Sequence, residues 1–246
     1  MPSSPMLHRW YLGLEGFTRT DQSTLTNSLD GLVTAASVNR ASWSALIGYA
    51  YRDAWVLEGG YARMPIHNQL TLVTAPQSVA FTFTNESHAA MLRFKRRLFQ
   101  TGKRKNQAGL WLTAGAYIVP SSGKYVDGFI MEGYRYRRFQ TAPDTLLLLS
   151  QTETAKRTTG MLELGLEYNV RLSNRLEMGF YGRKIWGLQK ALVTEMIYSE
   201  NSVQTQSSRI TATGTGWSLG LALRYTYSFR RSMKSVYDLH GKYGNQ

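Results

Sequence analysis

The segment Thr215–Arg230, TGWSLGLALRYTYSFR, constrains the fold of this chain more than any other stretch. From Trp217 to Phe229 every second residue is large and apolar or aromatic, whereas the residues between them are small or polar. A repeat of two residues is the period of a β-strand, so this strand has one apolar face. The apolar face consists of Trp217, Leu219, Leu221, Leu223, Tyr225, Tyr227 and Phe229.

The order of residues along this apolar face favours a lipid environment. Trp217 stands at one end, two tyrosines and Phe229 stand at the other, and leucines lie between them. Transmembrane strands place aromatic rings at the two membrane interfaces in this way. The opposite face carries glycine and alanine, which suits a crowded interior better than water. A single amphipathic strand also occurs in soluble sheets. The choice between a membrane protein and a soluble protein therefore depends on the rest of the chain.

The same alternation recurs along the chain and predicts eight strands in all. Between them, Arg19–Arg40 and Pro120–Arg157 are expected to be long loops. Ile185–Thr213 is expected to be a protruding hairpin, whereas Ser173 and Asn174 form a short turn. The predicted strands are His8–Thr18, Ala41–Arg52, Trp55–Val73, Val79–Phe99, Ala108–Val119, Leu162–Leu172, Leu176–Arg183 and Thr215–Arg230. The aromatic residues expected at the membrane interfaces are Trp10, Trp43, Tyr49, Tyr51, Trp55, Trp217, Tyr225, Tyr227 and Phe229.

Long and short connections alternate, which places the long ones at one end of a barrel and the short ones at the other. Over residues 8–230 the chain resembles the small eight-stranded bacterial outer-membrane barrels of the OmpA, OmpX and OmpW type. The resemblance implies an all-β, antiparallel, up-and-down transmembrane β-barrel with long extracellular loops and short periplasmic turns. It also implies an integral outer-membrane location in a Gram-negative cell, contact with outer-membrane lipid including lipopolysaccharide, and a strand end near Phe229 that the barrel-assembly machinery recognises.

The ends of the chain lie outside this barrel. Residues 1–7 are expected to be a lead whose secretory signal is absent or removed, because they contain no apolar core of the usual length. Residues 231–246 are expected to form a periplasmic tail.

Composition excludes several other classes of protein. The chain of 246 residues has no run near the ~20 apolar residues that a transmembrane helix needs, and it has no cysteine. The formal net charge of +13 suits nucleic-acid binding, but the bases fall in turns or alternate with apolar residues. No recognition helix, zinc-ligand spacing or aromatic RNA-binding motif is present in the sequence. We therefore expect no nucleic-acid partner, no cofactor and no metal.

Charged residues on the non-lipid faces predict what fills the barrel. An eight-stranded barrel has room only for its own side chains, and charges persist there when they are paired and hydrogen-bonded. Acids and bases nearly balance, so a plugged lumen is expected, with Glu163, Glu167 and Arg224 in one network because their strands would face each other across the barrel. The alternative is a small gated channel that prefers anions. The predicted inward charges are Glu15, Glu58, Glu163, Glu167, Glu177, Arg52, Arg93, Lys95, Arg97, Arg171, Arg183 and Arg224.

Catalysis is not expected. The histidines are His8, His67, His88 and His240, and only His88 has an adjacent serine, Ser87. Neighbouring residues of a strand point to opposite faces, so this pair is poorly placed as a catalytic dyad. The histidine spacing does not suggest a metal site either.

The long connections are the expected place for binding, because loops of rigid scaffolds commonly carry it. The run Tyr134, Arg135, Tyr136, Arg137 and Arg138 interleaves aromatic and cationic side chains, which can bind phosphates or an anionic glycan or protein. The competing interpretation is a β-extension with one charged face. A soluble lipocalin-like carrier, with the leucine faces lining a ligand cavity, is the second alternative for the whole chain.

Overall fold

The computed structural model describes residues 6–73, 78–101, 108–138 and 142–231, and β-strands make up most of this part. The side chains of residues 6, 7 and 229–231 are not described. No helix in the described ranges is long and apolar enough to cross a membrane. The strands are β1 (Met6–Leu25), β2 (Val33–Ala36), β3 (Val38–Tyr51), β4 (Trp55–Arg63), β5 (Ile66–Val73), β6 (Ser78–Asn85), β7 (His88–Thr101), β8 (Ala108–Val119), β9 (Tyr125–Arg135), β10 (Asp144–Thr154), β11 (Thr159–Arg171), β12 (Leu176–Gly187), β13 (Leu192–Glu200) and β14 (Val203–Arg231).

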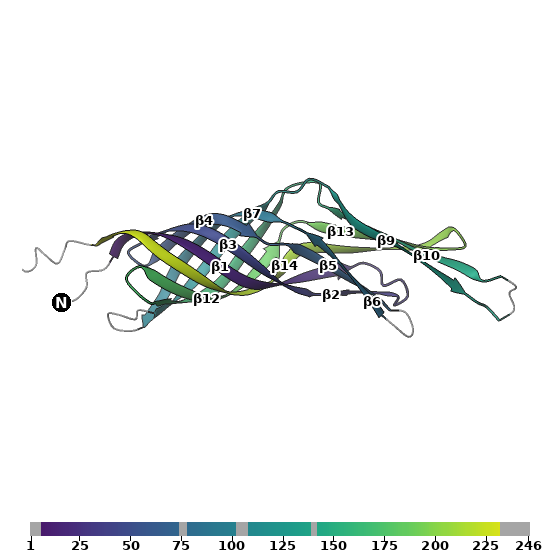
Figure 1. The fold of residues 1–246 in the computed structure, drawn as a ribbon, viewed down its shortest axis with the longest axis horizontal. Helices are drawn as coiled ribbons and strands as arrows, with labels where there is room; N and C mark the ends of the chain where they lie inside the picture. Colours follow the sequence, from purple (N-terminus) through teal and green to yellow (C-terminus); the bar gives the residue numbers. More distant parts are fainter. Residues whose placement is uncertain (1–5, 74–77, 102–107, 139–141, 232–246) are drawn as a thin grey trace, which may run out of the picture.

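Eight of these strands close into a barrel. Their order is β1-β3-β4-β7-β8-β11-β12-β14, and β14 pairs with β1 to complete the ring. Neighbouring strands are antiparallel throughout the ring. The predicted fold class is therefore confirmed. Figure 1 shows the barrel at the end where β1 begins and β14 ends, and a long β-structure that projects from the other end.

The pleat of each barrel strand separates lipid-facing from lumen-facing residues, as the alternation predicts. On β14 the leucines are exposed on the outside, whereas Ala222 and Arg224 are buried inside. Trp217 and Tyr225 are eight residues apart, about 27 Å along a strand. At a tilt of roughly 40° this corresponds to about 21 Å along the barrel axis, close to the height of an outer-membrane apolar belt. Because the leucines face outward, the lipocalin-like arrangement is wrong.

The expected loop at Arg19–Arg40 is wrong, because most of it is strand. β1 continues to Leu25, β2 follows, and β3 begins at Val38. The stretch is rich in serine, threonine and asparagine, which resembles loop composition. Those polar residues lie on the water-facing sides of strands that have left the membrane, while Val33 and Val38 are buried.

The two longest predicted strands are each interrupted. Trp55–Val73 breaks at Met64 and Pro65, and Val79–Phe99 breaks at Glu86 and Ser87. Proline cannot donate a ladder hydrogen bond, so the barrel strand ends before it. The outer pieces, β5 and β6, pair with each other, and β5 also pairs with β2, in a separate three-stranded sheet.

The other long connections are also hairpins. β9 pairs with β10 within the expected loop Pro120–Arg157. β13 pairs with the first part of β14, which confirms the protruding hairpin, and its tip is Asn201 and Ser202. Both tip residues have positive φ angles, 51° and 65°, as the two-residue turn of a tight hairpin requires.

These outer strands pack into one unit, here called the extracellular extension: β2, β5, β6, β9, β10, β13 and residues 203–213 of β14. Side chains from its two sheets share a second apolar core, separate from the barrel interior. Across the sheets, the rings of Phe81 and Phe129 stack with centroids 4.1 Å apart. The buried members of this core are Leu29, Val33, Ile66, Leu70, Leu72, Phe83, Leu148, Ala191, Leu192, Met196, Ile210 and Ala212.

Candidate functional site

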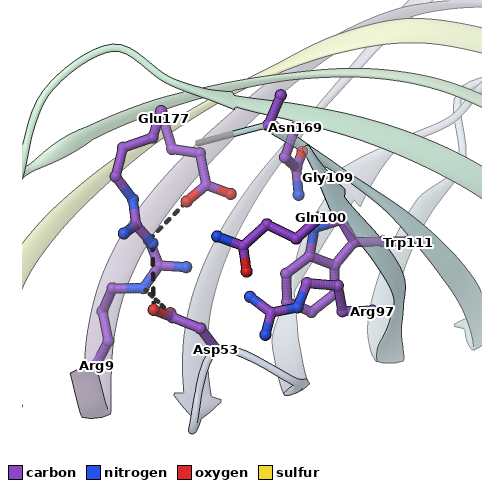
Figure 2. A pocket seen from close by; sticks show the side chains of 10 residues that line it. Arg9, Asp53, Arg97, Gln100, Gly109, Trp111, Asn169 and Glu177 are labelled. Carbon is purple, nitrogen blue, oxygen red and sulfur yellow. Dashed lines mark hydrogen bonds and ion pairs between the residues drawn. The ribbon is translucent and has the colours of Figure 1, made fainter. Parts of the chain in front are cut away.

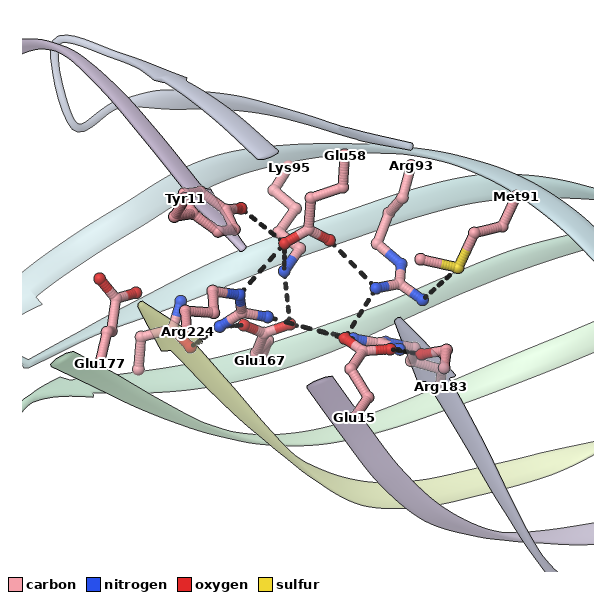
Figure 3. A network of polar contacts seen from close by, with 12 residues as sticks. Tyr11, Glu15, Glu58, Met91, Arg93, Lys95, Glu167, Glu177, Arg183 and Arg224 are labelled. Carbon is pink, nitrogen blue, oxygen red and sulfur yellow. Dashed lines mark hydrogen bonds and ion pairs between the residues drawn. The ribbon is translucent and has the colours of Figure 1, made fainter. Parts of the chain in front are cut away.

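The middle of the barrel lumen holds equal numbers of acids and bases, here called the central network (Figure 3). β1 and β4 supply one glutamate each and β11 supplies two, while β7 supplies two bases and β12 and β14 one each. All eight side chains are almost fully buried, and each is in an ion pair. The members are Glu15, Glu58, Glu163, Glu167, Arg93, Lys95, Arg183 and Arg224.

Glu167 lies at a crossing point of this network. Its carboxylate is 2.6 Å from Arg224 Nη1, 2.9 Å from Lys95 Nζ and 3.0 Å from Arg183 Nη2. Glu15 is a second crossing point, 2.8 Å from Arg93 Nη1 and 2.9 Å from Arg183 Nη2. Each of these carboxylates pairs with more than one base, and electrostatic attraction is strong in a medium of low dielectric. The shared pairs therefore hold the basic side chains in one position.

Glu163, Glu167 and Arg224, which are predicted to share one network, all belong to the central network. Glu163 pairs with Arg93 and accepts a hydrogen bond from the Tyr117 hydroxyl, and Arg224 reaches Glu167. The predicted reason is wrong, because β11 and β14 flank β12 on the same side of the barrel. The two strands are next-but-one neighbours, so long side chains meet along the wall.

Tyrosines contribute contacts to the central network that the sequence analysis missed. The Tyr11 hydroxyl donates to Glu58 Oε1 at 2.6 Å, and the guanidinium of Arg183 lies 3.4 Å from the centre of the Tyr181 ring. Arg93 Nη2 donates to the Tyr117 hydroxyl at 3.1 Å. Their position on the charged face of each strand is the sequence signal that could have identified them.

A close approach at Gly48 leads to a testable effect. A Cβ atom on Gly48 would lie 2.1 Å from Cζ of Tyr11. We expect Gly48→Ala to displace that ring and its bond to Glu58, and to lower the free energy of unfolding by about 1–3 kcal/mol. Gly16→Ala is the matched control, since its Cβ would meet nothing within 4 Å. Urea unfolding in lipid vesicles measures both, and equal stability of the two variants would contradict the expectation.

The periplasmic mouth of the lumen holds a second group of charges (Figure 2). Arg9 Nη1 donates to Glu177 Oε2 at 2.6 Å, and its Nε lies 3.6 Å from Asp53 Oδ1. Arg171 Nη2 lies 3.4 Å from Asp53 Oδ2. Arg97 is half-buried here, with its guanidinium 6.0 Å from the centre of the Trp111 ring. These side chains surround a recess of about 30 Å³, which has room for about two waters.

Arg52 is not part of this group, although it is predicted to point inward. It lies exposed in the turn between β3 and β4 with a φ angle of 51°. The next residue, Asp53, turns inward and is buried. The strand alternation ends at the turn, so a face predicted by counting in steps of two no longer applies.

A third group of charges, one ion pair, lies at the outer end of the barrel. Arg19 Nη2 lies 2.7 Å from Asp21 Oδ1 and donates to the Gly214 carbonyl at 2.9 Å. The backbone N–H of His67 donates to Asp21 Oδ2 at 3.0 Å. Both charged side chains are buried, although sequence reasoning placed them in a loop. Beyond them begins the core of the extracellular extension.

The run Tyr134–Arg138 lies at the far tip of the extracellular extension. Arg137 is 2.7 Å from Asp144 and 2.8 Å from Glu200, and Arg135 pairs with the same two acids. The hydrogen bond from Asn201 and the two arginines lower the pKa of Asp144. Both arginines therefore hold β9 and β10 against the β13–β14 tip. Tyr134, Tyr136 and Arg138 remain exposed to solvent, with Tyr136 81% exposed.

The interface aromatics form two levels on the barrel surface. Trp43 and Trp217 lie at the outer level. The outward-facing Trp186 also belongs to this level and was missed, because its strand was predicted to end earlier. Trp10, Tyr49, Tyr51, Trp55, Tyr225 and Tyr227 lie at the periplasmic level, and the side chain of Phe229 is outside the described part of the structure.

In the part of the chain that the structure describes, the histidines hydrogen-bond to tyrosine or threonine hydroxyls and not to a serine. Ser87 Oγ donates to the Met64 carbonyl, and His88 Nδ1 is bonded to the Tyr61 hydroxyl on the outside. His67 Nδ1 is 2.9 Å from Thr84 Oγ1. His240 lies outside the described residues. No group of three potential metal ligands occurs within the described ranges.

Comparison with known proteins finds solved structures of low similarity. No protein-family model matches the chain, and no curated protein matches it. The solved outer membrane protein OprG from Pseudomonas aeruginosa is similar at 11% identity, with 92% of this chain and 99% of that chain covered and a TM-score of 0.47. The outer membrane protease OmpT from Escherichia coli is similar at 11% identity, with 89% and 96% covered and a TM-score of 0.33. The transport unit of the autotransporter AIDA-I from Escherichia coli is similar at 11% identity, with 90% of each chain covered and a TM-score of 0.29.

The location follows from the chain's own structure. The ring of strands is closed, leucines cover its outside, and aromatic residues mark both edges of the leucine belt. Only a bilayer can cover such a belt, and closed barrels of this kind belong to outer membranes. The chain is an integral β-barrel of the bacterial outer membrane.

Proposed function

We propose that this protein is a non-catalytic membrane anchor with a closed lumen, which presents the extracellular extension as a binding surface for a ligand or protein outside the cell. The central network is the observation that supports this proposal most. Four acids and four bases from different walls meet in the middle of the lumen. A passing ion would have to separate pairs that are stabilised by a low-dielectric surrounding.

The rest of the interior supports a closed anchor as well. The Arg19–Asp21 pair occupies the outer end of the barrel, and the second apolar core lies directly beyond it. A solute that moves outward along the barrel axis would meet this core, whose buried members include leucine, isoleucine and valine. A gated channel would need both the pairs and this core to move.

The extracellular extension is suited to binding because it is a folded scaffold with apolar groups on its surface. β9 is the last strand of its sheet, so its outer edge has no strand partner among the described residues. Ile130 and Tyr134 are exposed on this edge strand. Edge strands and exposed aromatics commonly take up partner chains.

A conductance measurement tests the closed lumen. The full chain, inserted into a planar lipid bilayer, is expected to show no steps above the background at either polarity, because the central network blocks ions. A large porin inserted under the same conditions serves as the positive control. Reproducible single-channel steps from the wild-type protein would refute the anchor and support the gated channel.

A further inference from the structure

Five basic residues gather at the outer membrane boundary on one side of the barrel, above β8, β11 and β12. They come from the β8–β9, β10–β11 and β12–β13 connections and from the outer part of β12. Four of them are exposed, and the fifth, Lys184, is partly exposed. The group is here called the basic rim patch and consists of Lys124, Lys156, Arg157, Lys184 and Lys190.

Backbone hydrogen bonds hold the three connections together. Gly123 N–H donates to the Ala155 carbonyl at 2.9 Å, and Ala155 N–H donates to the Ala191 carbonyl at 3.0 Å. Thr154 N–H donates to the Lys124 carbonyl at 2.9 Å. The bases at positions 124, 156, 157 and 190 therefore project from one joined platform.

The tryptophans of the outer aromatic level show where this platform lies relative to the membrane. Lys184 Nζ lies 5.2 Å from the centre of the Trp217 ring, and Trp186 is exposed two residues further along β12. Next, Leu188 is 60% exposed just past the end of that strand. On the periplasmic side of this level the outer wall presents Leu112 of β8 and Leu166 of β11 to the bilayer. The patch thus stands directly above acyl chains, at the height of lipid head groups.

The bases of the patch lack acidic partners. None of the five is in an ion pair among the residues that the structure describes. Of the acids on the neighbouring strands, Glu195 pairs with Arg209, whereas Glu153 accepts a hydrogen bond from the neutral amide of Gln151 at 3.0 Å and keeps its charge. Five bases therefore face a single acid that has no cationic partner among the described residues. By contrast, Arg63 on the opposite wall is 2.6 Å from Glu86. A group of like charges repels itself, so an external anion that joins them is stabilised.

The tyrosine and arginine run at the tip is a weaker candidate for the same ligand. Arg135 stands eleven residues beyond Lys124, about 36 Å along an extended strand. Arg135 and Arg137 also have carboxylate partners. Head-group phosphates lie far below that tip.

We propose that the basic rim patch binds the phosphate groups of a lipid in the outer leaflet, with the acyl chains of that lipid lying along the leucine wall below. The chemistry is that of a phosphorylated lipid A, the membrane part of lipopolysaccharide. Lysine and arginine stems extend along apolar surface while their charged ends reach the head groups. Several cations on one platform can share two phosphates, and Lys184 is held at the interface by Trp217.

A lipid titration tests this proposal. The full chain, refolded in neutral detergent with a chelator of divalent ions, is mixed with bisphosphorylated lipid A, and bound lipid is counted by native mass spectrometry. We expect the triple variant Lys156→Gln, Arg157→Gln, Lys190→Gln to bind roughly tenfold more weakly than the wild type. Fully dephosphorylated lipid A is expected to bind weakly to both proteins.

The matched control is Arg40→Gln, Arg96→Gln, Arg175→Gln, which removes the same charge from exposed positions outside the patch. We expect this variant to bind lipid A like the wild type. An unboiled gel, on which each folded barrel migrates differently from its boiled form, verifies folding of both triples. Equal loss in the two variants, no loss in the patch variant, or equal binding of dephosphorylated lipid would overturn the proposal. Displacement of lipid A by millimolar inorganic phosphate would overturn it in favour of a free phosphate ligand.

Discussion

Glu167→Gln is expected to lower the free energy of unfolding by about 3–5 kcal/mol, because it leaves three buried bases short of a partner. The carboxylate lies within 3.0 Å of Lys95, Arg183 and Arg224, and no water can replace it, since the side chain is fully buried. Glutamine keeps the shape of the glutamate side chain, so the loss of stability measures the effect of removing its negative charge. Urea unfolding in lipid vesicles, followed by tryptophan fluorescence, measures it.

Two further variants separate charge pairing from general damage to the barrel. Glu195→Gln removes an exposed carboxylate that has one partner, Arg209, and it is expected to cost between about 0 and 1 kcal/mol. Combining Glu167→Gln with Lys95→Met removes one charge of each sign and is expected to recover part of the loss. If Glu167→Gln is as stable as Glu195→Gln, the central network does not hold the barrel together.

Leu70→Ala is expected to destabilise the extracellular extension by about 2–5 kcal/mol while the barrel stays folded. Leu70 is fully buried in the second core, on β5 between Ala35 of β2 and Phe81 of β6. The barrel has a separate interior and its own closed ring of hydrogen bonds. Local opening of one cooperative unit is therefore the expected result.

Hydrogen exchange with mass spectrometry measures this effect strand by strand. Peptides from β2, β5 and β6 should exchange faster in Leu70→Ala, whereas peptides from β8 and β11 should remain protected. Val73→Ala is the control, because Val73 lies on the same strand and is half exposed. Loss of protection throughout the barrel would mean that the two cores unfold as one unit.

The transmembrane strands were largely predictable from the sequence. β8 has the predicted bounds, Ala108–Val119, and the inward and outward residues of β11 and β12 follow the predicted alternation. The reason is physical: inside a bilayer each strand residue faces either lipid or lumen, so hydrophobicity reports its face directly. Inward charges are visible in the sequence for the same reason.

Only part of the extracellular extension could be predicted in this way: the β13–β14 hairpin and the strand residues of β5 and β6 were expected, whereas β2 and the β9–β10 hairpin were not. Its strands have water on one side and a small core on the other, and its polar residues resemble those of loops. β2 has only four residues, and it forms a strand because it pairs with β5, which lies more than thirty positions later in the chain. Arg19 and Asp21 are buried because such distant segments close over them.

By itself, the sequence determined that eight strands with apolar outer faces close around charged residues, because local alternation is sufficient for that. Tertiary structure alone decided which charges meet. Arg224 reaches past β12 to pair with Glu167, and Arg93 pairs with Glu163. In the turn, Asp53 points inward whereas Arg52 does not. Strand order, stagger and turn geometry set those distances, and none of them is encoded in the period of a single strand.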